Sequence, residues 1–345
     1  MRKCSPLSVI TSSVLPAGSV GVSYSVALAA TGGVTPYKSW SIVGGTLPNG
    51  MSLSGLSGVL AGILNGIPTA SGVFTFTAQV TDSANSTASN QFSLTIAPAP
   101  LSISITAVTN AASYVAGGVS PGELITIFGE GLGPVTLVGL QLDTQGRVAT
   151  TLSGTQVLFD GIAAPLIYAQ EQQVSAVVPY GVFGNSATKL QVSYQGRTSN
   201  TLSLPIVPTT LGIFSLDGSG AGAGAIVNQD GTVNSPNNPA PAGSIVFVYA
   251  TGEGQTNPAG IDGKPNASPA PLPLATPVTA TVGGANASVR YAGGVTGLVP
   301  GVLQVNFEIP SGTSAASAVP VVLTIGGQAS QPGVTLAVGP AASGH

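Results

Sequence analysis

Histidine and cysteine are almost missing from this sequence. Its 345 residues include one histidine, His345, and one cysteine, Cys4. Zinc sites with histidine or four cysteine ligands, Cys/His dyads and intramolecular disulfides need more of these residues than the chain has. A Ser-His-Asp triad would have to recruit the last residue, where chain ends usually fray. We interpret His345 as a tail or tag remnant, and we predict no catalytic, cofactor-binding or metal-binding residues and no enzyme activity.

Charge is also scarce. The chain has 8 Lys and Arg and 11 Asp and Glu, a net charge of −3, and only 6% charged residues against ~25% in typical domains. The basic residues stand singly, so the sequence lacks the basic patch that nucleic-acid binding requires. No run of ~18 apolar residues occurs, which excludes a membrane-spanning helix. The function classes left are those of a neutral, globular protein.

The start of the chain lacks the pattern of an export signal. Met1-Arg2-Lys3-Cys4 is basic, but Ser5 and Pro6 stand where the apolar stretch should begin. The chain is therefore either cytosolic or a trimmed piece of an exported protein. Few charges and many Ser, Thr, Asn and Gly residues are typical of secreted bacterial surface proteins. We therefore expect an extracellular or cell-surface location.

Alternation with a period of two predicts strands almost everywhere. Phe74, Phe76, Ala78 and Val80 alternate with polar residues, which indicates one buried and one wet face. Glycine-rich turn signals punctuate such segments, in a chain with 48 Gly and 27 Pro. No amphipathic helix of ten residues or more is evident. The predicted fold class is all-β, as tandem immunoglobulin-like β-sandwiches.

A break in composition and an internal repeat predict the domain organisation. Ala97-Pro98-Ala99-Pro100 is typical of a short, semi-rigid linker. Trp40 is expected in the core of the domain before it. We predict a first sandwich, a linker, two copies of a second sandwich and a tail, with the boundaries 1–97, 98–104, 105–208, 209–339 and 340–345.

The two copies align at two offsets. Phe128-Gly129-Glu130-Gly131 matches Thr251-Gly252-Glu253-Gly254 at an offset of 123. The segment that begins Gln173-Val174-Ser175 matches the one that begins Gln304-Val305-Asn306 at an offset of 131. The difference predicts an eight-residue insertion in the second copy, around 293–301.

The first predicted domain resembles the Putative Ig family of bacterial surface proteins, which is related in fold to cadherin-like modules. The matching residues include Leu15-Pro16-Ala17-Gly18, Leu47-Pro48-Asn49-Gly50 and Val80-Thr81-Asp82. One departure is that this chain has both Gly62 and Gly66 where the family usually has a single glycine. The resemblance implies an Ig-like sandwich.

Residues from about 105 to 339 are similar to an uncharacterised C-terminal domain family of exported soil-bacterial proteins. The matching segments include Asn110-Ala111-Ala112-Ser113-Tyr114, Ser120-Pro121-Gly122-Glu123 and Tyr249-Ala250-Thr251-Gly252-Glu253-Gly254. This resemblance implies no activity. Each half also resembles the IPT/TIG version of the Ig fold, which implies a spacer or interaction module.

Three features carry candidate chemistry. Glu130 and Glu253 are repeat-equivalent, and a pair of carboxylates could act as the catalytic pair of a glycosidase. Equivalent residues of two domains normally lie one domain apart, however. We therefore predict that both are exposed carboxylates in turns. The glycine-rich run 218–225 lacks the ending of a phosphate loop and is expected to be a flexible lead into the strand at 225–227. Calcium is the one cofactor left open, with Asp82 and Asn85 as candidate ligands.

Two functional hypotheses remain. The first is a non-catalytic spacer, adhesion or scaffold array, whose partner is an unknown surface protein. The alternative is a carbohydrate-binding appendage with a polysaccharide partner, for which aromatic residues should form a row on an exposed sheet face; the candidates are Tyr168, Tyr180, Tyr194 and Tyr291. Because few charges guard the sheet edges, self-association is a further hypothesis.

Overall fold

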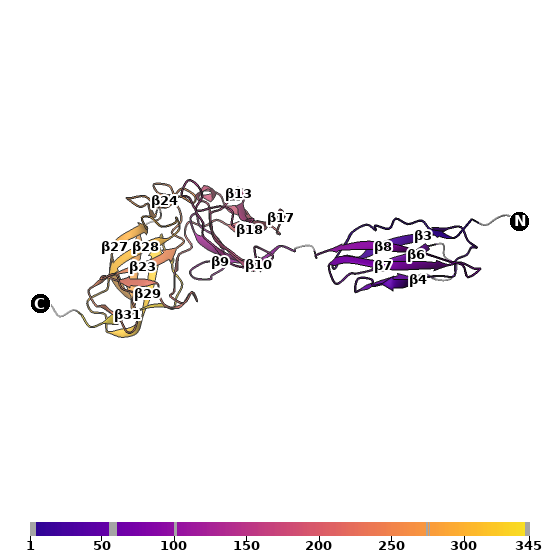
Figure 1. Ribbon diagram of the computed structural model, residues 1–345. Coiled ribbons are helices and arrows are strands. Elements are labelled where there is room, and N and C mark those ends of the chain that lie inside the picture. Colours follow the sequence, from indigo (N-terminus) through magenta and orange to yellow (C-terminus); the bar gives the residue numbers. More distant parts are fainter. Residues whose placement is uncertain (1–4, 55–60, 100–101, 274, 276, 342–345) are drawn as a thin grey trace. The chain divides into compact units, whose positions relative to one another are not determined.

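The protein is described by a computed structural model, which places residues 5–54, 61–99, 102–273, 275 and 277–341 (Figure 1). The chain divides into two compact units, Met1–Leu101 (unit 1) and Ser102–His345 (unit 2). The predictions about Cys4 and His345, and parts of the predicted linker and tail, lie outside the described residues. Within the described ranges no helix is long and apolar enough to cross a membrane.

Unit 1 is a sandwich of two four-stranded sheets, with the strand orders β1-β3-β6-β5 and β2-β8-β7-β4. The strands are β1 (Ser8–Val9), β2 (Gly18–Ser19), β3 (Tyr24–Thr31), β4 (Ser39–Gly45), β5 (Met51–Ser54), β6 (Ala61–Gly66), β7 (Gly72–Thr81) and β8 (Thr87–Ala97). The predicted alternation is confirmed in β7, where Phe76, Ala78 and Val80 are buried. Phe76 packs on Phe92 of β8 with 5.7 Å between ring centroids.

Trp40 lies in this core, as predicted, and is 5% exposed. Its ring explains one of the two unusual glycines, because a Cβ at Gly62 would stand 2.8 Å from Trp40 Cγ. Gly66 has φ +146°, and a Cβ there would stand 2.2 Å from the carbonyl oxygen of Gly50. At both positions neighbouring atoms come so close to the backbone that only glycine fits.

The first half of unit 2 is a second sandwich. Its sheets have the orders β11-β14-β15-β10-β9 and β13-β12-β16-β17, and β18 also pairs with β16. The strands are β9 (Ser104–Asn110), β10 (Leu124–Glu130), β11 (Val138–Gly139), β12 (Thr155–Phe159), β13 (Ile162–Ala163), β14 (Leu166–Ala169), β15 (Gln173–Val177), β16 (Ala187–Tyr194), β17 (Arg197–Thr198) and β18 (Leu202–Pro205). A single 3₁₀ turn, η1 (Tyr180–Val182), follows β15 and is the one helical element among the described residues.

The second half encloses a separate hydrophobic core. Its main strand order is β19-β23-β28-β27-β26-β29-β31-β20, with β21 on β23, β22 on β31 and β30 on β29, and β24 pairs with β25 apart from it. The strands are β19 (Gly212–Ile213), β20 (Gly222–Ala223), β21 (Ile226–Asn228), β22 (Ala240–Pro241), β23 (Ile245–Thr251), β24 (Thr256–Asn257), β25 (Leu272–Pro273), β26 (Val278–Val282), β27 (Ala285–Gly294), β28 (Leu303–Glu308), β29 (Ala316–Ile325), β30 (Gln328–Ala329) and β31 (Val334–Gly339). The glycine-rich run 218–225 thus contains a short strand, β20, and the strand expected at 225–227 begins at Ile226.

The two halves share the order of their main strands, whereas β11 in the first half and β20, β21 and β22 in the second have no counterpart. In the first half, β13 and β14 belong to different sheets, and Ala164-Pro165 separates them. In the second half one strand, β27, pairs with β26 through its first residues and with β28 through its last. Proline cannot donate to a sheet ladder, so Pro165 ends the pairing at the position where β27 continues. The prediction of an all-β chain of tandem Ig-like sandwiches is confirmed.

Candidate functional site

Hydrogen bonds join the two halves of unit 2 along a contact that we call the seam. Four of these bonds, 2.8–2.9 Å long, have a donor in the first half and an acceptor in the second, and the Ser120 and Thr210 hydroxyls form a further bond of 2.7 Å. The four run from Leu124 N to Thr251 Oγ1, Asn110 Nδ2 to Thr210 O, Tyr180 N to Asp262 Oδ1, and Val148 N to Gly263 O. The halves are therefore docked through buried backbone and side-chain groups.

Tyr180 is the central side chain of the seam. It is 5% exposed, and burial raises the pKa of its phenol, with the charges of Glu253 and Asp262 as further causes. A Cβ at Gly260 of the second half would stand 2.3 Å from ring atoms of Tyr180, and one at Gly122 would stand 2.6 Å from the ring. The ring therefore fits between two backbone segments that carry no side chain at the point of contact.

A carboxyl group of the first half, Glu123, is also buried at the seam. Its Oε1 accepts a 2.9 Å bond from Asn110 Nδ2 and its Oε2 a 2.8 Å bond from Ser120 N. Burial raises the pKa of Glu123 to about 7, although hydrogen bonds from Thr210, Ser120 and Asn110 act in the opposite direction. The group therefore titrates near neutral pH rather than near its ordinary 4.5.

Glu253 lies on the other side of the seam, and the prediction that it is an exposed turn carboxylate is wrong. It is 2% exposed, and in the described part of the chain its Oε2 has no hydrogen-bond partner. Burial, followed by the charge of Glu123, raises its pKa to about 8. Its repeat-equivalent, Glu130, is exposed as predicted. The first half covers the turn of the second copy, which the repeat alone could not show.

The glycines beside Glu253 explain how its turn fits. Gly252 and Gly254 have φ +86° and +80°, a backbone conformation that favours glycine. A Cβ at Gly254 would stand 1.9 Å from Pro208 O, so the turn rests directly on the backbone that joins the two halves.

The two carboxyl groups of the seam have raised pKa values, and one of them, Glu123, lines a pocket of about 370 Å³ together with Asn110 and Thr210. Both groups are fully buried, unlike the pair of a glycosidase that flanks a bound sugar. Sequence reasoning gave Glu123 no role. Its position directly before the apolar strand Leu124-Ile125 is not a sufficient signal, because Glu130 at the other end of the same strand is exposed.

The carboxylate of Asp82, the candidate calcium ligand, accepts hydrogen bonds from backbone N–H groups. Its Oδ1 accepts bonds from Ala84 N and Ser86 N at 2.9 and 2.8 Å, and its Oδ2 accepts one from Val34 N at 2.9 Å. These bonds, the bond from Val34 first, lower its pKa. Asn85 Oδ1 instead accepts a bond from Lys38 Nζ. No group of three metal-ligating side chains occurs among the residues that the structure describes.

The four candidate tyrosines do not form an exposed row. Tyr180 and Tyr194 are buried, and Tyr168 and Tyr291 are half-buried. The Tyr180 ring packs between the two halves at the seam. The interpretation of these residues as a flat platform for sugars therefore loses its main support, and only Tyr291 lines a pocket described below.

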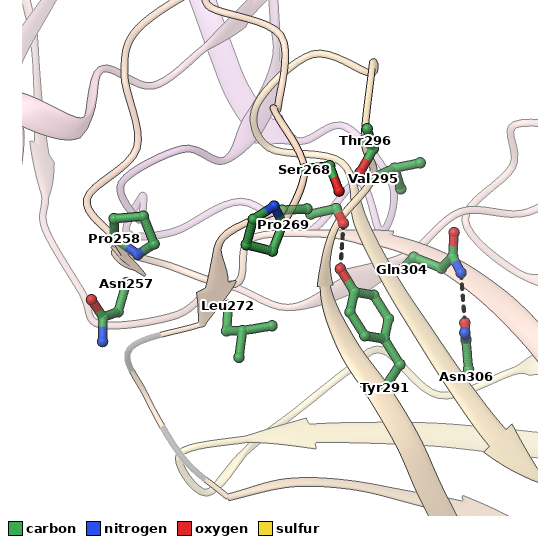
Figure 2. A pocket seen from close by; sticks show the side chains of 12 residues that line it. Asn257, Pro258, Ser268, Pro269, Leu272, Tyr291, Val295, Thr296, Gln304 and Asn306 are labelled. Carbon is green, nitrogen blue, oxygen red and sulfur yellow. Dashed lines mark hydrogen bonds between the residues drawn. The ribbon is translucent and has the colours of Figure 1, made fainter.

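An open pocket of about 580 Å³ lies on the second half (Figure 2). Its wall on one side is the outward face of β27 and β28, where Tyr291, Gln304 and Asn306 stand. A β-bulge between Val289 and Tyr291 brings Tyr291 opposite Asn306; bulges commonly re-aim a side chain in this way. The facing wall consists of β24, β25 and the loop between them, with Asn257, Pro258, Ser268, Pro269, Ala270 and Leu272.

The third side of the pocket is the end of β27, with Gly294, and the segment after it, with Val295 and Thr296. Tyr291 Oη donates a 2.6 Å bond to Gly294 O, which ties this segment to the sheet (Figure 2). These residues belong to the insertion predicted at 293–301. The wall is therefore built from chain that the first copy lacks.

Comparisons with known proteins agree with this architecture. Residues 6–97 match the family model of the Putative Ig domain, and residues 98–206 match that of the IPT/TIG domain. No curated protein matches the sequence.

Solved structures that are similar to the chain include two titin fragments and a Bacteroides ovatus protein. The I9–I11 tandem of titin is 9% identical over 97% of this chain and all (100%) of its own, with a TM-score of 0.24. The titin I-band fragment I67–I69 is 7% identical over 97% and 99%, with a TM-score of 0.29. The Bacteroides ovatus protein SGBP-B, in complex with a mixed-linkage heptasaccharide, is 12% identical over 97% and 71%, with a TM-score of 0.29. The order indicated by the sequence is confirmed by the family models: a Putative Ig domain stands first, and an IPT/TIG domain follows it.

Proposed function

We propose that the chain is a non-catalytic scaffold or spacer segment of an extracellular or cell-surface protein, with Ig-like modules that hold other parts of that protein apart or present them to a partner. The observation that carries the proposal is the seam. Its bonds dock the two halves of unit 2 into one compact unit, which is what a spacer of fixed length requires. The matched domain families are typically non-catalytic, which supports the same role.

The proposal includes the division into domains at 1–97, 105–208 and 209–339. Three separate hydrophobic cores support it, built from residues 15–96, 105–204 and 211–338. The shared strand order of the last two supports their interpretation as copies of one IPT/TIG-like sandwich.

Stretching the full chain between its ends with optical tweezers tests this role. A spacer should keep its length until whole domains unfold, and residues 6–97 should release about 300 Å at ~3.4 Å per residue. The two halves should not separate before one of them unfolds. Extension at low force, with the halves parting while both stay folded, would refute a spacer of fixed length.

A further inference from the structure

The pocket of the second half has an uncharged lining. Its twelve residues include no Asp, Glu, Lys, Arg or His. The next outward-facing residue of β28, Glu308, is already paired with Arg290 at 2.6 Å. A ligand recognised by its charge would find no counter-charge here, so the lining fits a neutral molecule.

The side chains of the lining leave hydrogen-bonding groups free. Gln304 Nε2 donates a 2.7 Å bond to Asn306 Oδ1, and this bond leaves the Oε1 acceptor of Gln304 and the Nδ2 donor of Asn306 unused (Figure 2). Within the described part of the chain, the Ser268 and Thr296 hydroxyls and the Asn257 amide also have no side-chain partner. A donor and an acceptor side by side are what a sugar hydroxyl, itself both donor and acceptor, can satisfy.

Apolar surface completes the pocket. The Pro258 and Pro269 rings, the Leu272 side chain and the Tyr291 ring border the same space as the amides (Figure 2). The bond from Tyr291 Oη to Gly294 O fixes the ring, so little side-chain freedom is left to lose on binding. This combination suits sugars, which present apolar C–H faces together with hydroxyls. The pocket volume of about 580 Å³ lies within the range of ~300–1,000 Å³ usual for ligand pockets.

We propose that this pocket binds a short stretch of a neutral polysaccharide, with the free amide groups of Gln304 and Asn306 bonding its hydroxyls. The site adds a binding function to the scaffold proposed above and does not depend on it. It also differs from the row of tyrosines considered in the sequence, because one tyrosine and two amides carry it. The wall at 294–296 belongs to the second copy, so each chain should bind with one site in unit 2.

Affinity electrophoresis of the full chain tests the proposal. Native gels would contain dextran, soluble starch, galactomannan or arabinoxylan as neutral probes, and polygalacturonate or alginate as anionic probes. At least one neutral polysaccharide should retard the chain, and the Gln304→Ala/Asn306→Ala double variant should bind it at least tenfold more weakly. Gln173→Ala is the matched control, since Gln173 is the repeat-equivalent of Gln304 in the half without the insertion, and it should bind as the unchanged chain does.

Each other outcome would overturn the proposal. No retardation of the folded chain by any neutral probe, retardation by the anionic probes alone, or equal retardation of the double variant would each show that the pocket does not bind neutral sugars. Thermal melting establishes that all variants are folded. If the chain binds no polysaccharide, the stretching experiment still tests the proposed scaffold role independently.

Discussion

Replacing Glu253 by glutamine should change how the stability of unit 2 depends on pH. Burial and the charge of Glu123 raise the folded-state pKa of Glu253 to about 8, whereas its ordinary value is 4.5. The folded chain thus holds this proton more tightly than the unfolded chain. Stability from this group is fully present below pH 4.5 and is lost as the pH rises through about 8.

The size of the effect follows from the shift. Each pKa unit corresponds to ~1.4 kcal/mol, so ionising Glu253 in the folded chain costs on the order of 5 kcal/mol at most. Glu123, with a pKa raised to about 7, adds a smaller cost, and because the two carboxyls interact, the costs are not additive. Glutamine resembles the protonated acid, so Glu253→Gln should lie within about 1 kcal/mol of the unchanged chain at pH 5 and exceed it by a few kcal/mol at pH 9.

Urea unfolding at pH 5, 7 and 9 measures this difference, with circular dichroism as the signal. The chain's one tryptophan, Trp40, lies in unit 1, so its fluorescence reports that unit separately and provides an internal control. Glu130→Gln, at the exposed equivalent position, should change nothing. A stability of unit 2 that is flat from pH 5 to 9, or a Glu253→Gln variant that is equally destabilised at every pH, would refute the reasoning.

Four further outcomes are expected. Gly260→Ala should destabilise unit 2 by about 1–3 kcal/mol in calorimetry, because its Cβ would stand 2.3 Å from the Tyr180 ring; an unchanged melting temperature would contradict this packing. Thr251→Val should cost about 1–3 kcal/mol in the same measurement, because it leaves the buried Leu124 amide without its acceptor. Asp82→Asn should lower the urea midpoint seen by Trp40 fluorescence at pH 7, and the difference should shrink as the pH falls through the lowered pKa of Asp82. The uncharged edge strand β5 should support weak self-association that Ser52→Lys reduces; sedimentation velocity that finds monomer alone at all concentrations would argue against it.

Local patterns predicted the fold well because each strand carries its own signal. The alternation in β7 and the core position of Trp40 depend on neighbours within one sandwich, and both were predictable. The insertion at 293–301 was also predictable, since it needs only a comparison of the two copies. That this insertion forms one side of a pocket was not predictable, because the other two sides come from β27 and β28 and from β24 and β25.

The seam was hidden for a different reason. A repeat treats its two copies alike, so Glu130 and Glu253 should have had the same surroundings. Whether each of these side chains is buried depends on which face of its copy packs against the other half. That packing is set by the tertiary structure and is not visible in the repeat. Tyr180, too, has an ordinary sequence context, and only the docking of Gly260 against its ring shows why it is buried.

The buried seam between the two halves of unit 2 also limits how evolution can rearrange the domains of such a chain. A gene segment that encodes the second half alone would return Glu253 to water and leave the acceptors of Thr251, Thr210 and Gly263 without their donors. One that encodes the first half alone would uncover the Tyr180 ring. Duplication or transfer should therefore move residues 102–345 as one piece, whereas unit 1, whose core is its own, can be gained or lost without that constraint.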